Sequence, residues 1–477
     1  MWWVILLSLL FIFFGVIIIR ALLFNPKAQP VVSEEEIVFD KERAVESLRA
    51  LVQCKTISHK DASLEENEEF DKLISILPTL YPNIFKVCEL KTFPDRALLL
   101  RWKGKNSSSP AVMMSHYDVV PVNEDSWTHD PFSGEIKDGC LWGRGTLDTK
   151  STFNAALFAA DHLIAEDFVP QNDIYFAFSG GEEINGKGAV HIVDYFEENG
   201  IDPALVLDEG GAVVEDVFPG VKGSCGLIGV AEKGMMDVSY TVSSGGGHAS
   251  APKPGAPVDR LSRACLNMIA NPFKVHLTEP VAQMFDTLGR YSSFLYKVIF
   301  ANINIFLPVL DMLGKKSGGE LNALLRTTVA FTQMEGSSAS NVIPPKASLV
   351  SNIRLNPNDT IDSVLEYIKK TVDDENVSVS LIHGVNPSRI STTDCDGWKK
   401  ISSAVASTWR GCLVSPYLMV QCSDSRHYGR ISDKVYRFSA MDLTSEERAS
   451  IHGNDERIRL ETIEKSVEFY IRLLKSC

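Results

Sequence analysis

The sequence from Ala111 to Asp148 holds the side chains best suited to binding a metal ion. An apolar run, AVMM, leads to His116 and Asp118, and a Gly-rich turn, GRGTLD, ends in Asp148. Imidazole and carboxylate groups are the usual ligands of a catalytic zinc ion, which keeps one position open for water. His116 and Asp118 are two residues apart, so in an extended strand they face the same side. We expect Asp118 to accept the second ring N–H of His116 and to orient that ring. A buried His–Asp pair is also common without a metal, so this stretch alone leaves both interpretations open.

Three later segments end apolar runs with further acidic or histidine side chains. Glu182 and Glu183 follow IYFAFS, Asp208 and Glu209 follow ALVL, and His452 lies in the turn SIHGNDERI. The carboxyl ends of parallel strands gather at one edge of a sheet, where sites are usually built. Adjacent glutamates alone are more often a solvated acidic turn. Their place in an ordered series of acidic and histidine residues favours a metal site instead.

The order and the local sequences of these segments resemble the dizinc metallopeptidase family that includes aminoacylase, carboxypeptidase G and carboxypeptidase S. The resemblance covers roughly Val45 to the C-terminus. It is closest to the branch of carboxypeptidase S and the N-fatty-acyl-amino-acid synthase/hydrolase. It rests on the strings SHYDVVP, GRGTLDTK, LDEGG, EKG, GHASAP, NVIPP, DSRHY and HGNDERI. It implies a metallopeptidase or amidohydrolase that acts on peptide or N-acyl amino acid bonds.

The resemblance implies two zinc ions that share one carboxylate ligand. The implied ligands are His116, Asp148 and Asp208 for one ion and Asp148, Glu183 and His452 for the other. Cobalt or manganese would suit the same ligands, because sites rich in oxygen and nitrogen donors select weakly among these ions. Glu182 is the implied general base, and a carboxylate in that place can move a proton from water to a leaving amine. With Asp118, it belongs to the expected catalytic residues. The family commonly has a cis peptide bond after the residue equivalent to Asp148.

Three residues of a later unit are assigned by the resemblance alone. His248, in GGGHAS, would donate to the substrate carbonyl oxygen, either within the chain or across a homodimer. Asn341, in SNVIPP, would lie near the same oxygen, and Arg354, in SNIRLNP, would bind a substrate carboxylate. A guanidinium group suits bidentate recognition of a carboxylate. The string DSRHY, residues 424–428, would line the substrate pocket. Without the resemblance, a turn histidine and a surface arginine are the simpler interpretations.

The N-terminal segment is apolar and carries no charge from Met1 to Ile19. A helix needs ~20 apolar residues to cross the core of a bilayer. A cleaved signal peptide usually has a basic start, a shorter apolar core and a small-residue cleavage site, and no basic start is present here. We therefore expect residues 1–24 to form a single-pass transmembrane anchor. The alternative is a cleaved signal and a secreted protein. Residues 25–40, with proline and acidic side chains, are expected to be a linker.

The sequence gives conflicting indications about which side of the membrane holds the catalytic domain. Arg20 and Lys27 follow the apolar segment, and the positive-inside rule would place that end in the cytoplasm. The resemblance implies the opposite side, because the relatives work in the secretory pathway or the vacuole. The sequons at Asn106, Asn358 and Asn376 agree with that side. We expect an extracytoplasmic or lumenal catalytic domain.

The distribution of apolar residues predicts an α/β fold with an insertion. As far as Asp208, strand-length apolar runs alternate with helical patterns, which is typical of a mostly parallel sheet. After Gly226 the pattern changes to that of an α+β unit. The expected divisions are 41–225 for the first part of the dizinc domain, 226–383 for a ferredoxin-like lid or dimerisation domain, and 384–477 for the second part. A lid with a four-stranded sheet and two helices is implied by the resemblance.

The segment from Val281 to Leu325 is aromatic, aliphatic and poor in charge. Core packing or a dimer interface is the simplest interpretation. A wall for an acyl chain or a second surface in contact with the membrane is the functional alternative. Lys297 and Pro308 argue against a transmembrane span.

Composition limits the classes of partner. The chain has 477 residues, 45% of them hydrophobic, which is enough for more than one domain. Its net charge of −14 argues against general nucleic-acid binding. Its nine cysteines contain no CxxC pair, which argues against a cysteine zinc site.

The favoured hypothesis is a dizinc amidohydrolase that acts, in either direction, on an amide bond next to a free carboxylate. The expected small-molecule substrates are long-chain N-acyl amino acids. A carboxypeptidase or dipeptidase is the alternative within the same class. A catalytically inactive, membrane-anchored binding protein is the alternative of a different class, and it predicts a lost ligand or base. All the expected ligands and the base are present in the sequence.

Overall fold

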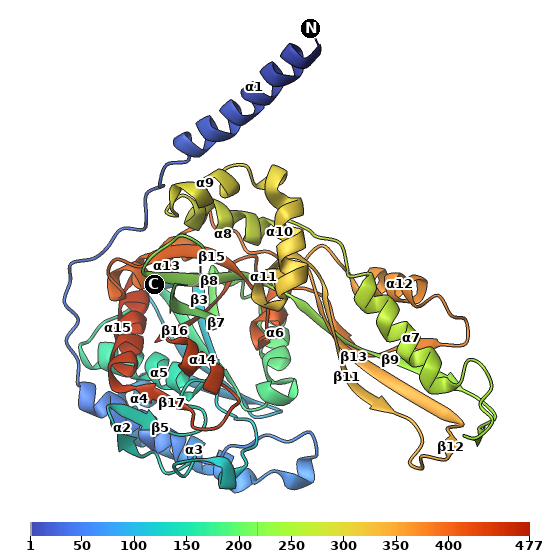
Figure 1. Ribbon diagram of the computed structural model, residues 1–477. Helices are drawn as coiled ribbons and strands as arrows, with labels where there is room; N and C mark the ends of the chain where they lie inside the picture. The colour runs from blue at the N-terminus through green and yellow to red at the C-terminus, as the bar shows by residue number, and fades with distance from the viewer. Residues whose placement is uncertain (1, 217) are drawn as a thin grey trace.

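The computed structural model of the protein describes residues 2–216 and 218–477, and an eight-stranded sheet lies at its centre (Figure 1). The strand order is β1-β2-β6-β3-β7-β16-β8-β15. The pairs β3–β6, β3–β7, β7–β16 and β8–β15 are parallel. The strands are β1 (Glu89–Phe93), β2 (Ala97–Trp102), β3 (Asn106–His116), β6 (Asn172–Ser179), β7 (Leu205–Glu215), β8 (Ser224–Glu232), β15 (Leu413–Met419) and β16 (Val435–Leu443). The predicted mostly parallel α/β sheet is confirmed.

Both faces of this sheet are covered, which explains why its strands read as continuous apolar runs. Along β2, Leu98 and Leu100 pack into one core and Leu99 into another, on opposite faces. Helices from both ends of the chain cover the first face, and α6 (Gly188–Glu198) covers part of the second. The first group is α2 (Lys41–Val52), α3 (Asn67–Leu80), α4 (Pro82–Val87), α5 (Lys150–Ala165), α13 (Asp396–Thr408) and α15 (Leu460–Ser476). The C-terminal segment therefore completes the domain that the N-terminal half begins.

A separate antiparallel sheet forms the lid, residues 234–275 and 328–385. Its order is β11-β13-β9-β14, and α7 (Pro257–Ala270) and α12 (Ile361–Val372) pack on it. The strands are β9 (Gly234–Ser243), β11 (Thr328–Glu335), β13 (Lys346–Leu355) and β14 (Ser378–Val385), with the short pair β10 (Gly247–His248) and β12 (Val342–Ile343) at the tip. Figure 1 shows the lid extending to one side of the central sheet.

The start of the lid differs from the predicted position 226. Strand β8 lies in the central sheet and is buried along almost its whole length, whereas β9 alternates buried and half-buried residues. A strand covered on both faces is uniformly apolar, and one with an open face alternates. The lid therefore begins at Gly234, after β8 has ended.

The remaining helices lie between the lid strands in sequence but pack against the catalytic domain. They are α8 (Glu279–Gly289), α9 (Phe294–Phe300), α10 (Ile303–Ser317) and α11 (Gly319–Leu325), with α8 lying against β15. The predicted apolar segment thus divides into a buried helix, α8, and the more exposed pair α9 and α10. The N-terminal helix α1 (Trp2–Leu23) is apolar and long enough to cross a membrane.

Short elements complete the edge of the domain near the C-terminus. A three-stranded sheet of β17 (Arg457–Arg459), β5 (Cys140–Trp142) and β4 (Ile136–Lys137) joins the segment after His452 to the segment before Asp148. Helix α14 (Ser445–Ser450) precedes His452. The 3-10 turn Glu182–Ile184 follows β6, and the 3-10 segment Asp424–Arg430 follows β15.

Candidate metal centre

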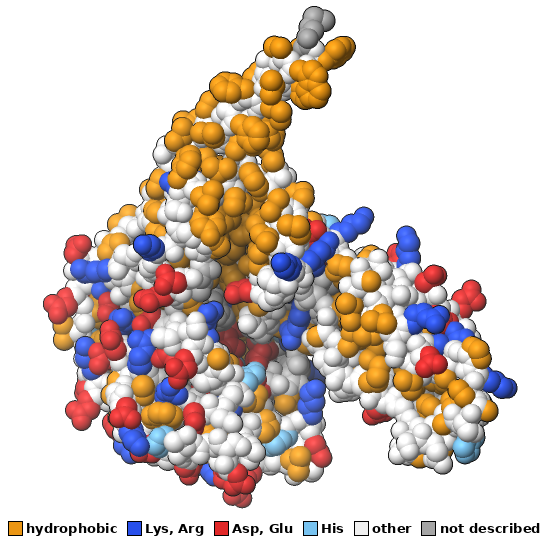
Figure 2. Space-filling view, in the orientation of Figure 1, with side chains coloured by type: hydrophobic (Ala, Val, Ile, Leu, Met, Phe, Trp, Pro, Cys, Tyr) orange, Lys and Arg blue, Asp and Glu red, His pale blue; other side chains and the backbone are white. Residues whose placement is uncertain are grey.

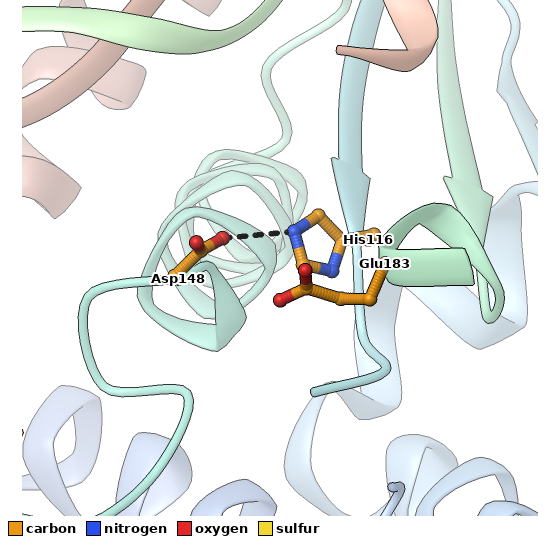
Figure 3. A group of neighbouring side chains, drawn as sticks. All are labelled: His116, Asp148 and Glu183. Atoms are coloured by element: carbon orange, nitrogen blue, oxygen red, sulfur yellow. Dashed lines mark hydrogen bonds and ion pairs between the residues drawn. The ribbon is translucent and has the colours of Figure 1, made fainter. Parts of the chain in front are cut away.

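Residues from several separate segments meet beside the carboxyl ends of the central strands. His116 is the last residue of β3, Asp148 lies in the turn before α5, and Glu182 and Glu183 lie in the turn after β6. His452 comes from the loop after α14. Figure 3 shows His116, Asp148 and Glu183 converging on one space. The predicted series of acidic and histidine residues is therefore brought together by the sheet.

Asp148 lies between two histidines and contacts each with a different oxygen. Its Oδ1 is 3.0 Å from Nε2 of His116, and its Oδ2 is 2.9 Å from Nε2 of His452. Nε2 of His452 is also 3.1 Å from Oε2 of Glu183. His116, Asp148 and Glu183 together offer three donor atoms within 4.8 Å of one another. A carboxylate that presents one oxygen to each side can bridge two ions.

The spacing of these donors suits direct hydrogen bonds, and it is close to the spacing of ligands around a metal ion. Two donors about 2.1 Å from one tetrahedral zinc ion lie about 3.4 Å apart. The distances between the histidine nitrogens and the neighbouring carboxylate oxygens run from 2.9 Å, for His452 and Asp148, to 3.3 Å, for His116 and Glu209. Imidazole nitrogen and carboxylate oxygen are the donor types that zinc accepts. The residues present therefore fit the two-metal site that the resemblance implied.

Burial and charge make this group of carboxylates costly without a cation. Burial raises the pKa of Glu182 well above its ordinary value, and it raises the pKa of Glu209 to about 8. Hydrogen bonds with Asp148 and Glu183 raise the pKa of His452 to about 10. Burial would raise the pKa of Asp148, but hydrogen bonds from the two histidines hold it far below its ordinary value. A divalent ion held between these side chains would compensate the same negative charges.

Asp118 has several contacts that orient the centre. Nδ1 of His116 is 3.0 Å from the Asp118 backbone carbonyl and 3.3 Å from Oδ1 of its side chain. The Asp118 carboxylate also accepts the backbone N–H groups of Glu182 (3.1 Å) and Glu183 (3.2 Å). It accepts the hydroxyl of Ser58 as well, at 2.7 Å. Asp118 therefore fixes both the imidazole and the turn that carries the glutamates.

The structure draws attention to Glu209, to which the motifs alone assigned no role. Its Oε1 is 3.3 Å from Nε2 of His116, and the two residues form a second group of possible ligands with Glu182. Asp208, the ligand implied by the resemblance, accepts the backbone N–H of Ser425 at 2.9 Å. The geometry favours Glu209 over Asp208 as the acidic partner of His116. Both residues stay candidates, since Asp208 is buried and Glu209 is half-buried near the imidazole.

A bulge in β7 explains why the local sequence did not show which of Asp208 and Glu209 faces His116. Strand β7 was expected to end at Asp208, but it continues to Glu215. Its pairing with β16 jumps from Asp208 to Gly211, so two residues are unpaired there. A bulge changes the direction of the side chains that follow it. The position of the bulge depends on the partner strand, which the local sequence does not reveal.

A buried ion pair holds the loop of His452 against the loop of Asp148. Glu456 accepts from Nη1 of Arg144 at 2.5 Å and from the backbone N–H of Leu147 at 2.7 Å. Both charged side chains are almost fully buried. Glu456 belongs to the motif HGNDERI and Arg144 to GRGTLD, but neither motif by itself predicted this contact. The peptide bond between Asp148 and Thr149, in the same loop, is cis, as the resemblance implied.

The predicted lid residues lie apart from the centre. His248 and Asn341 are neighbours at the lid tip, where Ala249 N–H donates to the Asn341 carbonyl at 3.0 Å. Figure 1 shows β12, which follows Asn341, at the end of the lid far from the central sheet. Among the residues that the structure describes, neither side chain has a hydrogen bond or ion pair with the metal centre. Arg354, near the end of β13, lies at the base of the lid with Nη1 3.5 Å from Sγ of Cys422.

The segment 424–428 reaches the centre beside the imidazole. Asp424 accepts from the hydroxyl of Ser179 at 2.6 Å, and burial raises its pKa to about 6. A small cavity of about 10 Å³ is lined by His116, Glu182, Asp208, Asp424 and Tyr428 among others. The predicted contribution of DSRHY to the wall of the site thus has a structural basis.

A mostly parallel sheet with a lid, and two histidines that share a carboxylate, define a metal-dependent hydrolase with a two-metal centre. The sequence profile of the peptidase family M20/M25/M40 matches residues 112–476, and the chain belongs to this family.

Named relatives come from two groups. The chain is 33% identical over 437 residues to the probable carboxypeptidase S-like 2 of Dictyostelium discoideum, covering 89% of this chain and 84% of the relative. It is also 33% identical over 450 residues to the N-fatty-acyl-amino acid synthase/hydrolase PM20D1 of Xenopus tropicalis, covering 92% and 86%. The resemblance drawn from the motifs is confirmed.

Solved structures share the fold at lower identity. The M20 family metallo-carboxypeptidase Sso-CP2 from Sulfolobus solfataricus gives a TM-score of 0.66 at 19% identity, covering 91% of this chain and 98% of that one. Human carnosine dipeptidase 1 gives 0.63 at 14% identity, covering 91% and 96%. The Bacillus subtilis YXEP protein, described as a dinuclear metal binding peptidase, gives 0.55 at 12% identity, covering 91% and 97%.

Proposed function

We propose that the protein is a dizinc amidohydrolase that cleaves, or in reverse forms, the amide bond of N-acyl amino acids. The observation that carries this proposal is the position of Asp148 between His116 and His452, with the Glu182–Glu183 turn beside them. The proposal treats His116, Asp148, Glu183 and His452 as ligands, with Glu209 or Asp208 completing the set.

The chain's own residues would divide the chemistry between them. Zinc ions held there would polarise the amide carbonyl and lower the pKa of a bound water. Glu182 would take the proton of the attacking water and return it to the nitrogen of the departing amine. Burial raises the pKa of Glu182 well above its ordinary value, so this carboxylate holds a proton more readily than an exposed glutamate does. Asp118 would hold the His116 ring and the turn of Glu182 and Glu183 in position.

Recognition of the free carboxylate is assigned to Arg354. It lies at the base of the lid, against Cys422 and near the segment 424–428 that lines the centre. A guanidinium group there could bind the carboxylate of the amino acid product on its way to or from the metals. His248 and Asn341 would reach the substrate carbonyl only from a second subunit or after the lid closes, because they lie at the lid tip.

A carboxypeptidase that releases amino acids from short peptides is the second candidate. It is supported by the relative named carboxypeptidase S-like, which is as similar to this chain as the synthase/hydrolase. Both reactions need the same metals, base and carboxylate-binding arginine. They differ in whether the acyl side of the bond is a fatty chain or a residue with an amino group.

The mechanism is tested by Glu182→Gln, which removes the base and keeps the side-chain shape. We expect metal content and the unfolding temperature to be unchanged and turnover to fall by at least about 10²–10⁴-fold, the range that general acid–base catalysis contributes. Glu68→Gln makes the same change at an exposed position of α3 and should leave activity intact. Normal turnover by the Glu182→Gln variant would refute the assignment.

The same preparations can separate the two substrate classes. Hydrolysis of N-oleoyl-phenylalanine but not of an unacylated dipeptide would support the acyl amino acid proposal. Cleavage of the dipeptide alone would favour the carboxypeptidase. A folded chain that binds no metal and cleaves neither compound would revive the inactive binding protein.

A further inference from the structure

Two consecutive helices outside the lid expose an unusual amount of apolar surface. Helices α9 and α10 meet at an angle of 102°, and we call this bent pair the elbow. Its exposed apolar side chains are Phe294, Leu295, Tyr296, Ile305, Val309, Met312 and Leu313. Large contiguous patches of this kind usually mark a binding or membrane-contacting surface.

Helix α10 has apolar residues on both its exposed side and its buried side, as a helix does when it lies between the protein and an apolar environment. Ile305, Val309 and Met312 recur at helical spacing on the exposed side, whereas Leu310 and Gly314 are buried against the protein. The helix therefore has enough apolar residues to pack inward and a second apolar stripe that no described residue covers. Packing of the elbow on its own domain does not account for that second stripe.

The elbow is continuous with the N-terminal helix. Ile17 and Ala21 of α1 are buried, and α1 packs against α9. The side-chain amide of Asn302, at the bend of the elbow, donates to the backbone carbonyl of Ile17 at 3.1 Å. Figure 2 shows hydrophobic side chains running without a break from α1 over this region, toward a hollow where acidic and histidine side chains are visible.

Helix lengths place the elbow at the level of a membrane surface if α1 spans the bilayer. Residues 2–16 precede the contact at Ile17 and account for about 23 Å of helix, less than the ~30 Å thickness of the hydrocarbon core. A spanning α1 must therefore bring the contact, and the elbow with it, into the boundary between acyl chains and headgroups. Helix α10 also rises only about 23 Å, so the elbow itself is too short to span.

We propose that the elbow is a membrane-docking surface, which lies in the interface of the bilayer that α1 enters. Its flanking charges fit such a position. Arg20 of α1 and Lys316 in the last turn of α10 are exposed, and long cationic side chains beside apolar surface extend toward lipid headgroups. Lys315 is exposed as well, but it pairs with Asp311 of the same helix at 2.9 Å.

The docking surface requires that α1 is anchored in the membrane, and the experiment tests the anchor and the docking surface at different positions. The full-length chain is reconstituted into nanodiscs of phosphatidylcholine that carry a nitroxide-labelled lipid. Single cysteines bearing an environment-sensitive fluorophore replace Phe11 in α1, Leu295 in α9 and Met312 in α10. Leu266→Cys and Ile269→Cys on α7 of the lid are matched controls, because they are apolar and 65% and 64% exposed, against 71% for Leu295 and 61% for Met312. The unsubstituted chain, labelled in parallel, gives the background from its nine native cysteines.

We expect the lipid nitroxide to quench the probes at positions 11, 295 and 312 at least about threefold more strongly than the probes on α7. Quenching at position 11 together with control-level signals at 295 and 312 would overturn the docking surface and leave the anchor in place. Control-level quenching at all three positions would overturn both. Cross-linking of positions 295 and 312 between chains, without lipid quenching, would overturn the proposal and show instead that a second copy covers the elbow.

Discussion

Asp148 is the residue on which both halves of the candidate centre depend. One oxygen faces His116 and the other faces His452, and these histidines come from the two separate parts of the catalytic domain. In the metal-free chain the carboxylate is compensated by protons on imidazole, because the surrounding carboxylates raise the pKa of His452 to about 10. Binding of a divalent ion must therefore displace protons.

Competition between protons and metal ions for the same side chains predicts that metal binding depends on pH. His452, with a pKa of about 10, and Glu209, with a pKa of about 8, both bind a proton at pH 7 in the metal-free chain. Metals need the deprotonated forms, so zinc affinity should rise as pH increases from 6 to 8 and protons should be released on binding. Calorimetric titrations in buffers of different ionisation enthalpy measure the released protons. Binding that releases none would contradict the electrostatic picture.

A second prediction at this scale separates Glu209 from Asp208. Because Glu209 lies 3.3 Å from His116 and Asp208 accepts the amide of Ser425, Glu209→Gln should lose one of the two ions. Asp208→Asn keeps an oxygen that can accept the same amide, and it should retain both ions. Elemental analysis of the two purified variants decides between them. Loss of metal from Asp208→Asn alone would restore the ligand that the resemblance implied.

At the scale of the elements, two loops are held together by one buried pair. The turn before α5 carries Asp148 and the loop before β17 carries His452, and Glu456 with Arg144 connects them. Removing one member leaves a charge in a place without water, which costs more than the pair contributes. The geometry of the metal ligands thus depends on an ion pair that touches no metal.

We expect Glu456→Ala to lower the free energy of unfolding by about 3–5 kcal/mol, since Arg144 would be buried without its partner. The double variant Arg144→Met, Glu456→Ala should recover part of this loss. Glu446→Ala breaks an exposed ion pair with Arg457 and should cost less than about 1 kcal/mol. Urea unfolding of the metal-free chain in detergent micelles gives all three values. Equal losses for Glu456→Ala and Glu446→Ala would show that the buried pair is not needed.

At the scale of the whole molecule, α1 and the elbow lie along one face. Figure 2 shows this face as apolar above and polar below. Helix α1 suits either a transmembrane anchor or a signal sequence. Packing of Ile17 and Ala21 against α9 favours retention of the helix in the mature protein.

Retention of α1 predicts that the expressed chain stays in membranes after alkaline carbonate extraction. The N-terminal sequence of the purified protein should begin within the first residues of α1. A soluble product that begins after residue 24 would identify the segment as a cleaved signal. The variant Leu9→Arg, which places a charge in the middle of α1, should weaken retention because a charge at the bilayer centre costs about 2.5–3.5 kcal/mol on insertion scales.

The sequence by itself determined the central sheet and most of the site. Uniformly apolar runs such as IYFAFS, separated by helical patterns, predict a sheet covered on both faces, because each strand must bury all its side chains. Acidic and histidine residues that directly follow those runs are brought together by the parallel arrangement. The parallel strands account for the meeting of His116 and Glu183, whereas the resemblance to a known family was needed to assign Asp148 and His452 to the same site.

Only the tertiary structure decided the features that depend on partners distant in sequence. The bulge that distinguishes Glu209 from Asp208 is set by the pairing of β7 with β16, and the start of the lid is set by the pairing of β8 with β15. The pair Arg144–Glu456 joins residues that are 312 positions apart. The exposed stripe of the elbow reads in sequence like a core helix, because periodicity shows that a face is apolar but not what covers it.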